Sequence, residues 1–294
     1  MPKDTELFSV QSNALSSILK VYDKTEESLA EDVLNLKDWM KGQHHLPEIL
    51  NDKRVQNFLI LNKCNVEKAK KKYRQLLQFP KSEVDKLIYH VPLPKMTKDM
   101  YRVFLQKYRI KDKVGQIDPY DLLKMAYNLH EIRLKEDVMC GDVIIFDLKG
   151  TSMRLLSKLT PAFLVTVITL YKKIFSLPLK GLYIINIVPY VSTLLSVFKT
   201  LVKPKLFARV HVCNDANILK EHFPLEMLAR DYGGTEKSVD ELHELCELKL
   251  QEYQDRFDLL DKLRVNESLR PAILENEDDE FLGYHGNFRK LNID

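Results

Sequence analysis

The sequence predicts an α/β fold in which a mostly parallel sheet follows an all-helical N-terminal region. Two apolar runs, 143–146 and 182–188, have the continuous hydrophobic character of strands that are buried on both faces. Helical periodicity marks residues 160–175 and 190–203, so strands and helices alternate along this part of the chain. Such alternation is typical of parallel strands joined by crossover helices.

The first 95 residues have the pattern of helices. Apolar residues recur at helical spacing around Trp39, the only tryptophan. Asn65 is the expected N-cap of a helix over 66–77. Residues 91–94, Val-Pro-Leu-Pro, are expected to form an extended linker, because a residue before proline avoids helical backbone.

The sheet region continues with a strand expected over 101–108 and a helix that opens at Asp118-Pro119, where proline takes the first helical position. A short strand is expected at 209–212. Residues 238–263 are charged and favour a helix, and residues 275–280 form an acidic stretch. We therefore expect three parts, which are a helical module (1–95), a sheet domain (96–240) and a C-terminal helix and acidic tail packed on the body (241–294).

Several function classes are excluded by composition and motifs. The 45 basic and 42 acidic residues give a net charge of +3, too small to indicate nucleic-acid binding. None of the nine glycines belongs to a GxGxxG or GxxxxGK[ST] motif, so a dinucleotide or P-loop phosphate site is not expected. The eight histidines show no metal-binding spacing, and no catalytic constellation can be assembled. We expect a protein without metal, cofactor or enzymatic activity.

The cellular compartment is predicted from cysteine usage and the N-terminus. The four cysteines are dispersed without a CxxC pair, and the N-terminal residues contain no apolar run. We therefore expect a cytoplasmic protein. Residues 181–198 carry no charge, but Pro189 in their middle favours a strand followed by a helix over a membrane span.

The most informative feature is a long segment in which every charged residue is basic. No acidic residue lies between Asp147 and Asp215, and the rest of the chain sums to −7. The segment holds ten basic residues, Lys149, Arg154, Lys158, Lys172, Lys173, Lys180, Lys199, Lys203, Lys205 and Arg209. Such a segment is expected to be drawn to anionic membranes. The alternative is that these side chains only solvate separate faces of the domain.

Two local patterns leave alternatives open. The helix after Pro189 has one apolar stripe, which fits either a helix packed on a core or one that lies on a membrane. Asp142 shares a strand face with Ile144 and Phe146. It is expected either at a solvent-exposed strand end or, if buried, beside a partner in a pocket.

A series of motifs resembles one known family. The run Gly141-Asp142-Val143-Ile144-Ile145-Phe146-Asp147-Leu148-Lys149-Gly150 resembles a strand motif of the CRAL-TRIO lipid-binding family. Further similar segments follow in the family's order, at 159–161, 179–186, 199–212 and 222–234. The module segment 65–69 and the tail 287–291 are also similar, the tail to insect members. The branch that it most resembles includes alpha-tocopherol transfer protein and cellular retinaldehyde-binding protein.

The resemblance implies a helical module packed against a sheet that floors an apolar ligand cavity, closed by a movable amphipathic lid. It implies a monomeric intracellular carrier of one small hydrophobic ligand, similar to tocopherol, a retinoid or a carotenoid, without catalysis. The lid would open during transient association with anionic membranes. The alternative is a phosphoinositide-binding or phospholipid-exchange module in membrane trafficking.

Carried over position by position, the resemblance implies a set of ligand-binding residues. They are Leu123, Ala126, His130, Asp142, Ile144, Phe146, Val167, Leu170, Tyr171, Leu182, Val191, Leu194, Leu195 and Phe198. Relatives are apolar at the position of Asp142 and carry a small hydroxyl at that of His130. These two side chains are therefore predicted to recognise a polar end of the ligand.

The membrane-binding residues implied in the same way are basic. They are Lys180, Lys199, Lys203, Lys205 and Arg209. Lys205 and Arg209 match two positions of a phosphoinositide-binding cleft of the family, whereas Ile60 and Pro178 stand at the other two. We therefore expect attraction to anionic membranes, with weaker selectivity for a particular headgroup.

Overall fold

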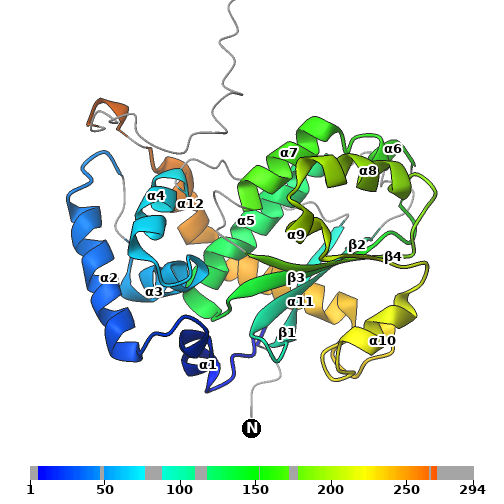
Figure 1. Ribbon diagram of the computed structural model, residues 1–294, viewed down its shortest axis with the longest axis horizontal. Coiled ribbons are helices and arrows are strands. Elements are labelled where there is room, and N and C mark those ends of the chain that lie inside the picture. The colour runs from blue at the N-terminus through cyan, green and yellow to red at the C-terminus, as the bar shows by residue number, and fades with distance from the viewer. Residues whose placement is uncertain are drawn as a thin grey trace, which may run out of the picture.

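The computed structural model describes residues 6–46, 50–76, 88–109, 118–151, 153–171, 178–264 and 266–269. A five-stranded sheet lies at the centre, with helices above and below it and a helical module to one side (Figure 1). The strands are β1 (Ile88–Met96), β2 (Tyr101–Tyr108), β3 (Gly141–Asp147), β4 (Leu179–Ile185) and β5 (Val210–Val212). The predicted α/β class with a mostly parallel sheet is confirmed.

The helices fall into three groups along the chain. The N-terminal module contains α1 (Ala14–Val21), α2 (Glu26–Lys41), α3 (Asp52–Leu61) and α4 (Val66–Leu76). The sheet region contains α5 (Pro119–Glu136), α6 (Met153–Leu156), α7 (Pro161–Thr169), α8 (Val191–Leu201), α9 (Pro204–Phe207) and α10 (Leu219–His222). The chain then forms α11 (Val239–Glu252) and α12 (Gln254–Lys262), with 3-10 turns at Ala216–Ile218, Arg230–Tyr232 and Glu267–Leu269.

The strands follow one another in the order β1-β2-β3-β4-β5. Strands β2 to β5 are parallel, and β1 pairs antiparallel to β2 at one edge. The expected linker at 91–94 is wrong, because these residues are the middle of β1. Pro92 pairs with Phe104 at the edge of the sheet, where a missing N–H is tolerated and the extended backbone that proline favours is retained. The expected domain boundary at 95/96 therefore falls within β1.

Short polar signals set where the helices begin. The Asn65 carboxamide accepts from the backbone N–H of Lys68 and caps α4, and Asp118 caps α5 ahead of Pro119. Both of these helix starts are confirmed. The region expected as one helix over 238–263 forms two, α11 and α12, which meet at Tyr253. The stretches 275–280 and 287–291 and the pair Lys172 and Lys173 lie outside the described residues.

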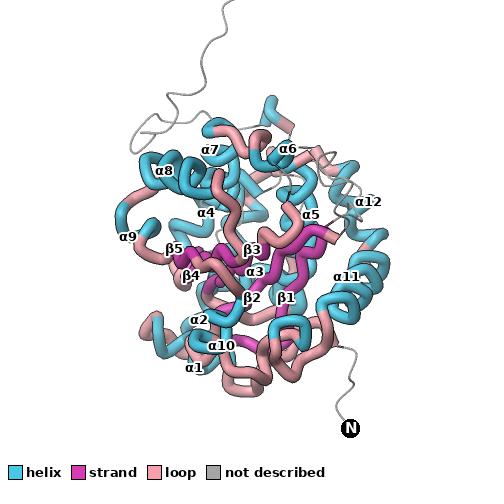
Figure 2. Tube along the Cα trace, turned by 90° about the vertical axis from the view of Figure 1, so that its right-hand side faces the viewer, coloured by secondary structure: helices cyan, strands magenta, loops and turns pink. Residues whose placement is uncertain are grey.

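The two faces of the sheet have different surroundings. Odd-numbered side chains of β3 and β4, such as Ile145 and Ile185, pack against α10 and α11 in a filled hydrophobic core. Figure 2 shows these two helices and the helices α7 and α8 on opposite sides of the sheet. The even-numbered side chains point the other way, toward α5, α7 and α8, because successive side chains of a strand alternate.

The far ends of β3 and β4 are tied to the chain that follows the sheet. The Tyr232 hydroxyl and the Asn186 amide each donate to the Asp147 carboxylate at 2.7 Å. Gly234 is enclosed so tightly that a Cβ atom there would lie 1.9 Å from the Leu228 carbonyl oxygen. The end of the segment 222–234, which resembles the family, is thus tightly packed against the sheet and the preceding loop.

The uncharged stretch 181–198 forms the end of β4, a turn and most of α8, as predicted. Among the described residues, no helix combines the length and the apolar character that crossing a bilayer requires.

Candidate functional site

The even-numbered face of the sheet forms the floor of a cavity of about 870 Å³. The register places Gln106, Phe146 and Ile184 side by side on neighbouring strands, and all three line the cavity. Tyr108, Ile144 and Leu182 complete the floor.

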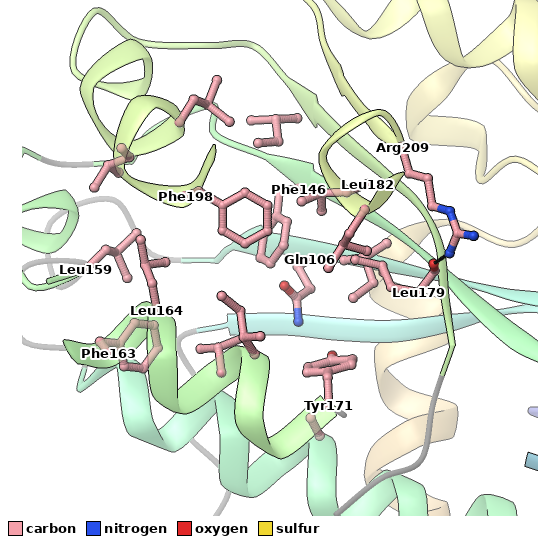
Figure 3. Close-up of a pocket in the computed structure, with 18 of the residues that line it drawn as sticks. Gln106, Phe146, Leu159, Phe163, Leu164, Tyr171, Leu179, Leu182, Phe198 and Arg209 are labelled. Atoms are coloured by element: carbon pink, nitrogen blue, oxygen red, sulfur yellow. Dashed lines mark hydrogen bonds between the residues drawn. The ribbon is translucent and has the colours of Figure 1, made fainter. Parts of the chain in front are cut away.

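Helices α5, α7 and α8 close the other sides of this cavity. Figure 3 shows Leu164 and Tyr171 projecting from the α7 side toward Phe198 of α8 and the sheet. The remaining apolar lining comes from Leu123, Ala126, Leu148, Leu156, Leu159, Phe163, Val167, Ile168, Pro178, Leu179, Val191, Leu194, Leu195 and Leu206. A space lined in this way favours an apolar occupant, because burial of apolar surface is the main driving force of such binding.

Helix α8, which forms one wall of the cavity, makes few buried contacts with the rest of the protein. Only Val191 among its residues is fully buried, and its N-cap, Tyr190, makes no side-chain capping bond. Tyr190 and Val197 are half-buried, so the apolar stripe faces inward while serines, threonines and Lys199 face solvent. The interpretation of the stripe as a packed face therefore describes the structure, with the cavity on its inner side.

Five cations from two segments far apart in the sequence line the cavity. Lys63 and Lys68 come from the N-terminal module, whereas Lys205 lies in α9 and Lys203 and Arg209 lie next to its ends. None of the five has an acidic partner within ion-pair distance among the residues that the structure describes. Burial and the neighbouring charge of Lys63 lower the pKa of Lys68. Uncompensated positive charge of this kind favours an anionic group.

Eleven of the fourteen predicted ligand residues line the cavity. They are Leu123, Ala126, Ile144, Phe146, Val167, Tyr171, Leu182, Val191, Leu194, Leu195 and Phe198. The other three, His130, Asp142 and Leu170, do not line it. Leu170 is buried in the hydrophobic cluster that joins α7 to the N-terminal module.

Asp142 belongs to a buried charge network and not to the cavity. It is 2% exposed, so the expected solvent-exposed strand end is wrong. Both of its carboxylate oxygens accept from the Arg133 guanidinium, at 2.6 and 3.0 Å. Arg133 also donates to Asp137 at 3.2 Å, and Asp137 accepts from Arg102 at 2.5 and 3.1 Å. The predicted contact between Asp142 and a polar ligand end is corrected to an ion pair with Arg133.

His130 lies in the same buried region as this network. It is 1% exposed, and burial together with the charges of Arg133 and Arg54 lowers its pKa to about 3. The ring is therefore neutral at physiological pH. Its predicted role as a ligand contact is also corrected, because the His130 side chain does not line the cavity.

The predicted membrane residues divide into two groups. Lys203, Lys205 and Arg209 line the cavity. Lys180 instead places its ammonium group 4.7 Å from the centre of the Tyr101 ring. Lys199 is exposed on α8 with its Nζ 5.6 Å from the centre of the Phe207 ring. These two lysines are therefore outside the group of cations that shares the cavity.

Sequence reasoning missed two polar and two cationic lining residues. Gln106 and Tyr108 could have been found from strand alternation, since they share a face of β2. Lys63 and Lys68 gave no such signal, because only the folded chain brings α4 to the cavity. They add positive charge to a cleft in which the predicted positions Ile60 and Pro178 supply none.

Comparison with known proteins gave two results. Residues 88–234 match the CRAL/TRIO domain family. A crystal structure of Sfh5 is similar to this chain at 14% sequence identity, with a TM-score of 0.45, over 84% of this chain and 100% of that one.

Proposed function

Because this chain belongs to the CRAL/TRIO family, whose members bind small lipophilic ligands, we propose that it carries one small hydrophobic molecule of the tocopherol, retinoid or carotenoid kind. The observation that carries this proposal is the cavity of about 870 Å³, most of whose lining is apolar. Burying about 300 Å² of apolar ligand surface there provides roughly 7–8 kcal/mol before the costs of association.

We further propose that α8 is the lid through which the ligand enters and leaves. Its side chains Leu194, Leu195 and Phe198 are only half-buried, and they line the cavity from one side. Its missing side-chain cap and its single fully buried residue support an outward movement at low cost. The adjacent cations Lys203 and Lys205 would hold the protein to an anionic membrane while the ligand crosses.

The ligand itself is identified by extraction. Purified protein is extracted with organic solvent and the extract is examined by mass spectrometry, with native mass spectrometry giving the stoichiometry. We expect one apolar molecule per chain. A protein that retains no apolar molecule and takes up none from vesicles would refute the carrier proposal. Because the chain is proposed to bind without catalysis, a ligand supplied in vesicles should be recovered chemically unchanged.

The membrane step is tested with a charge-matched pair of triple variants. One variant replaces Lys203, Lys205 and Arg209 by alanine. The other replaces three exposed lysines on other parts of the described chain, Lys20, Lys98 and Lys262. Each basic residue near an anionic surface contributes about 1 kcal/mol, so the first variant should bind phosphatidylserine vesicles at least tenfold more weakly. Equal binding by both variants would show that the cations at the cavity have no special role.

A second candidate function is recognition of a phosphoinositide, as in a lipid-exchange module. The observation that favours it is the group of five cations at the cavity, Lys63 and Lys68 among them, none of which has an acidic partner among the described residues. The two candidates separate with vesicles of equal surface charge that contain either phosphatidylserine or a phosphoinositide. A phosphoinositide preference that disappears in Lys63→Ala/Lys68→Ala supports the second candidate, whereas equal binding leaves these cations as a general membrane contact.

A further inference from the structure

The cavity contains one buried polar side chain whose hydrogen bonding is incomplete. Gln106 is 6% exposed, and its amide Nε2 lies 2.5 Å from Nδ1 of His90 on the neighbouring strand. Its Oε1 is shielded from water and has no hydrogen-bond partner among the described residues. A buried acceptor without a partner is uncommon in folded proteins and calls for an explanation.

His90 determines which end of the amide is free. Its ring stacks on Phe104 with 4.9 Å between ring centres. Burial and the charge of Arg133 lower its pKa to about 3, so the ring is neutral. The amide nitrogen of Gln106 can only donate, so Nδ1 of the neutral ring is its acceptor, in the tautomer that carries the proton on Nε2. This contact leaves the amide oxygen as the unused group.

A hydroxyl group accompanies this oxygen on the same face of β2. Tyr108 is two residues further along the strand and also lines the cavity. Its hydroxyl makes no hydrogen bond with another described residue. Burial raises its pKa, so the hydroxyl stays protonated and can both donate and accept. Figure 3 shows the Gln106 amide in the middle of the lining residues.

This polar pair is separated from Arg209, one of the five cations that line the cavity. Arg209 donates to the carbonyl of Leu179 at the start of β4, whereas Gln106 lies in register with Ile184 through Phe146. Five residues of strand separate Leu179 from Ile184, which is roughly 16 Å at about 3.3 Å per residue. Gln106 and Tyr108 therefore offer neutral hydrogen-bonding groups to the cavity at a distance from the Arg209 guanidinium.

Resting on the proposed carrier function, we propose that Gln106 and Tyr108 bind the hydroxyl group of an apolar alcohol. The ligand hydroxyl donates to Gln106 Oε1 and accepts from the Tyr108 hydroxyl, while its hydrocarbon body fills the space under α7 and α8. The terminal torsion of a glutamine side chain is soft, so an entering hydroxyl can turn the amide oxygen toward itself. The preferred ligand class is thus an alcohol, such as a sterol or an isoprenoid alcohol, over its ether, its ester or a plain hydrocarbon.

The test compares matched fluorescent probes on the full chain. The alcohols are all-trans-retinol and dehydroergosterol, and their methyl ethers keep the carbon skeleton while removing the donor hydrogen. Diphenylhexatriene, a hydrocarbon with no hydrogen-bonding group, reports whether the cavity binds apolar molecules at all. The variants are Gln106→Leu, which keeps the shape, and Tyr108→Phe, which removes only the hydroxyl.

We expect the wild-type protein to bind at least one alcohol about tenfold more tightly than its ether, the scale of one hydrogen bond to a buried acceptor. Gln106→Leu should bring this ratio close to one and leave the affinity for diphenylhexatriene unchanged. Equal wild-type affinity for alcohol and ether, or a preference that persists in Gln106→Leu, overturns the inference even where the hydrocarbon binds. Absence of diphenylhexatriene binding to the wild type instead overturns the carrier function. The ratio of the wild-type affinities for alcohol and ether tests the inference even if neither variant folds.

Discussion

Arg133 is the residue that makes a carboxylate at position 142 compatible with the protein interior. Burial raises the pKa of Asp142, and the two hydrogen bonds from Arg133 oppose that effect. For Asp137 burial also acts to raise the pKa, but the charges of Arg102 and Arg133 together lower it. Two arginines and two aspartates therefore form a neutral group at the start of the sheet, where a single charge would be very costly.

Removing one member of this group should destabilise the protein. Asp142→Ile leaves Arg133 with one aspartate instead of two, and the loss of a buried partner typically costs about 3–5 kcal/mol. Denaturant unfolding measures the change, and the relative affinities for different ligands should stay as in the wild type. Asp142→Asn serves as the control of similar size. A change of ligand preference without loss of stability would instead support a direct contact between Asp142 and the ligand.

Two buried histidines predict that stability falls as the solution becomes acidic. The pKa values of His90 and His130 are lowered to about 3 in the folded protein, and burial is the main cause. Below the unfolded pKa of about 6.5 the unfolded chain binds protons that the folded chain does not, so acid favours unfolding.

Each histidine should then cost about 1.4 kcal/mol of stability per pH unit below about pH 6. The loss is absent above the unfolded pKa and continues toward pH 3. Denaturant unfolding at pH 7, 6 and 5 checks this expectation. His130→Leu should reduce the slope of unfolding free energy against pH by the contribution of one histidine. An unchanged slope would mean that His130 is protonated in the folded state.

Helix α4 brings a cationic side chain of the N-terminal module, Lys68, to the cavity. Lys68 and Lys72 are one helical turn apart and lie on the same side of α4. Burial and the charge of Lys68 lower the pKa of Lys72 to about 8. The positive charge on this side of α4 therefore decreases as the pH rises through 8, well below the ordinary titration of lysine.

Attraction to anionic vesicles should follow the titration of Lys72. We expect binding to phosphatidylserine vesicles to be up to about fivefold weaker at pH 9 than at pH 7. This factor corresponds to the loss of about 1 kcal/mol, the contribution of one basic residue near an anionic surface. Lys72→Gln should bind more weakly at pH 7 and lose this part of the pH dependence. Lys20→Gln on α1 is the matched control. Identical wild-type binding at both pH values would contradict the prediction.

The elements that sequence reasoning found were those with strong local signals. The strands β3 and β4 are continuous apolar runs, and the caps Asn65 and Asp118 mark helix starts directly. Strand β1 was missed because two prolines imitate a linker, and only its pairing with β2 distinguishes an edge strand from an extended loop.

The candidate site shows the same division between local and long-range information. Its floor residues Ile144, Phe146 and Leu182 follow from strand alternation and the resemblance to known lipid-binding proteins. Asp142 was misread because its partner Arg133 lies on another element. Lys68 was missed because its place at the cavity depends on how the module packs. Long-range contacts of this kind leave no periodic trace in a sequence.

For the whole molecule, the sheet separates two tasks. One face carries a hydrophobic core with α10 and α11, which contributes to stability, and the other face carries the cavity. Neighbouring side chains of β4 belong to opposite faces. Leu182 lines the cavity, whereas Ile185 is fully buried in the core. The effect of shortening a side chain should therefore depend on its face.

Leu182→Ala and Ile185→Ala should separate stability from ligand binding. Ile185→Ala leaves a new void in a close-packed core, so we expect a loss of about 2–5 kcal/mol in the free energy of unfolding. Leu182→Ala only enlarges an existing space and should cost clearly less. Its affinity for diphenylhexatriene should nevertheless fall severalfold, because the ligand loses the contacts of the deleted atoms, while Ile185→Ala keeps that affinity at temperatures where it is folded. Denaturant unfolding and probe titration of both variants measure the two quantities. Equal losses of stability would mean that the cavity side is packed like the core, which would count against a carrier whose interior is reserved for a guest molecule.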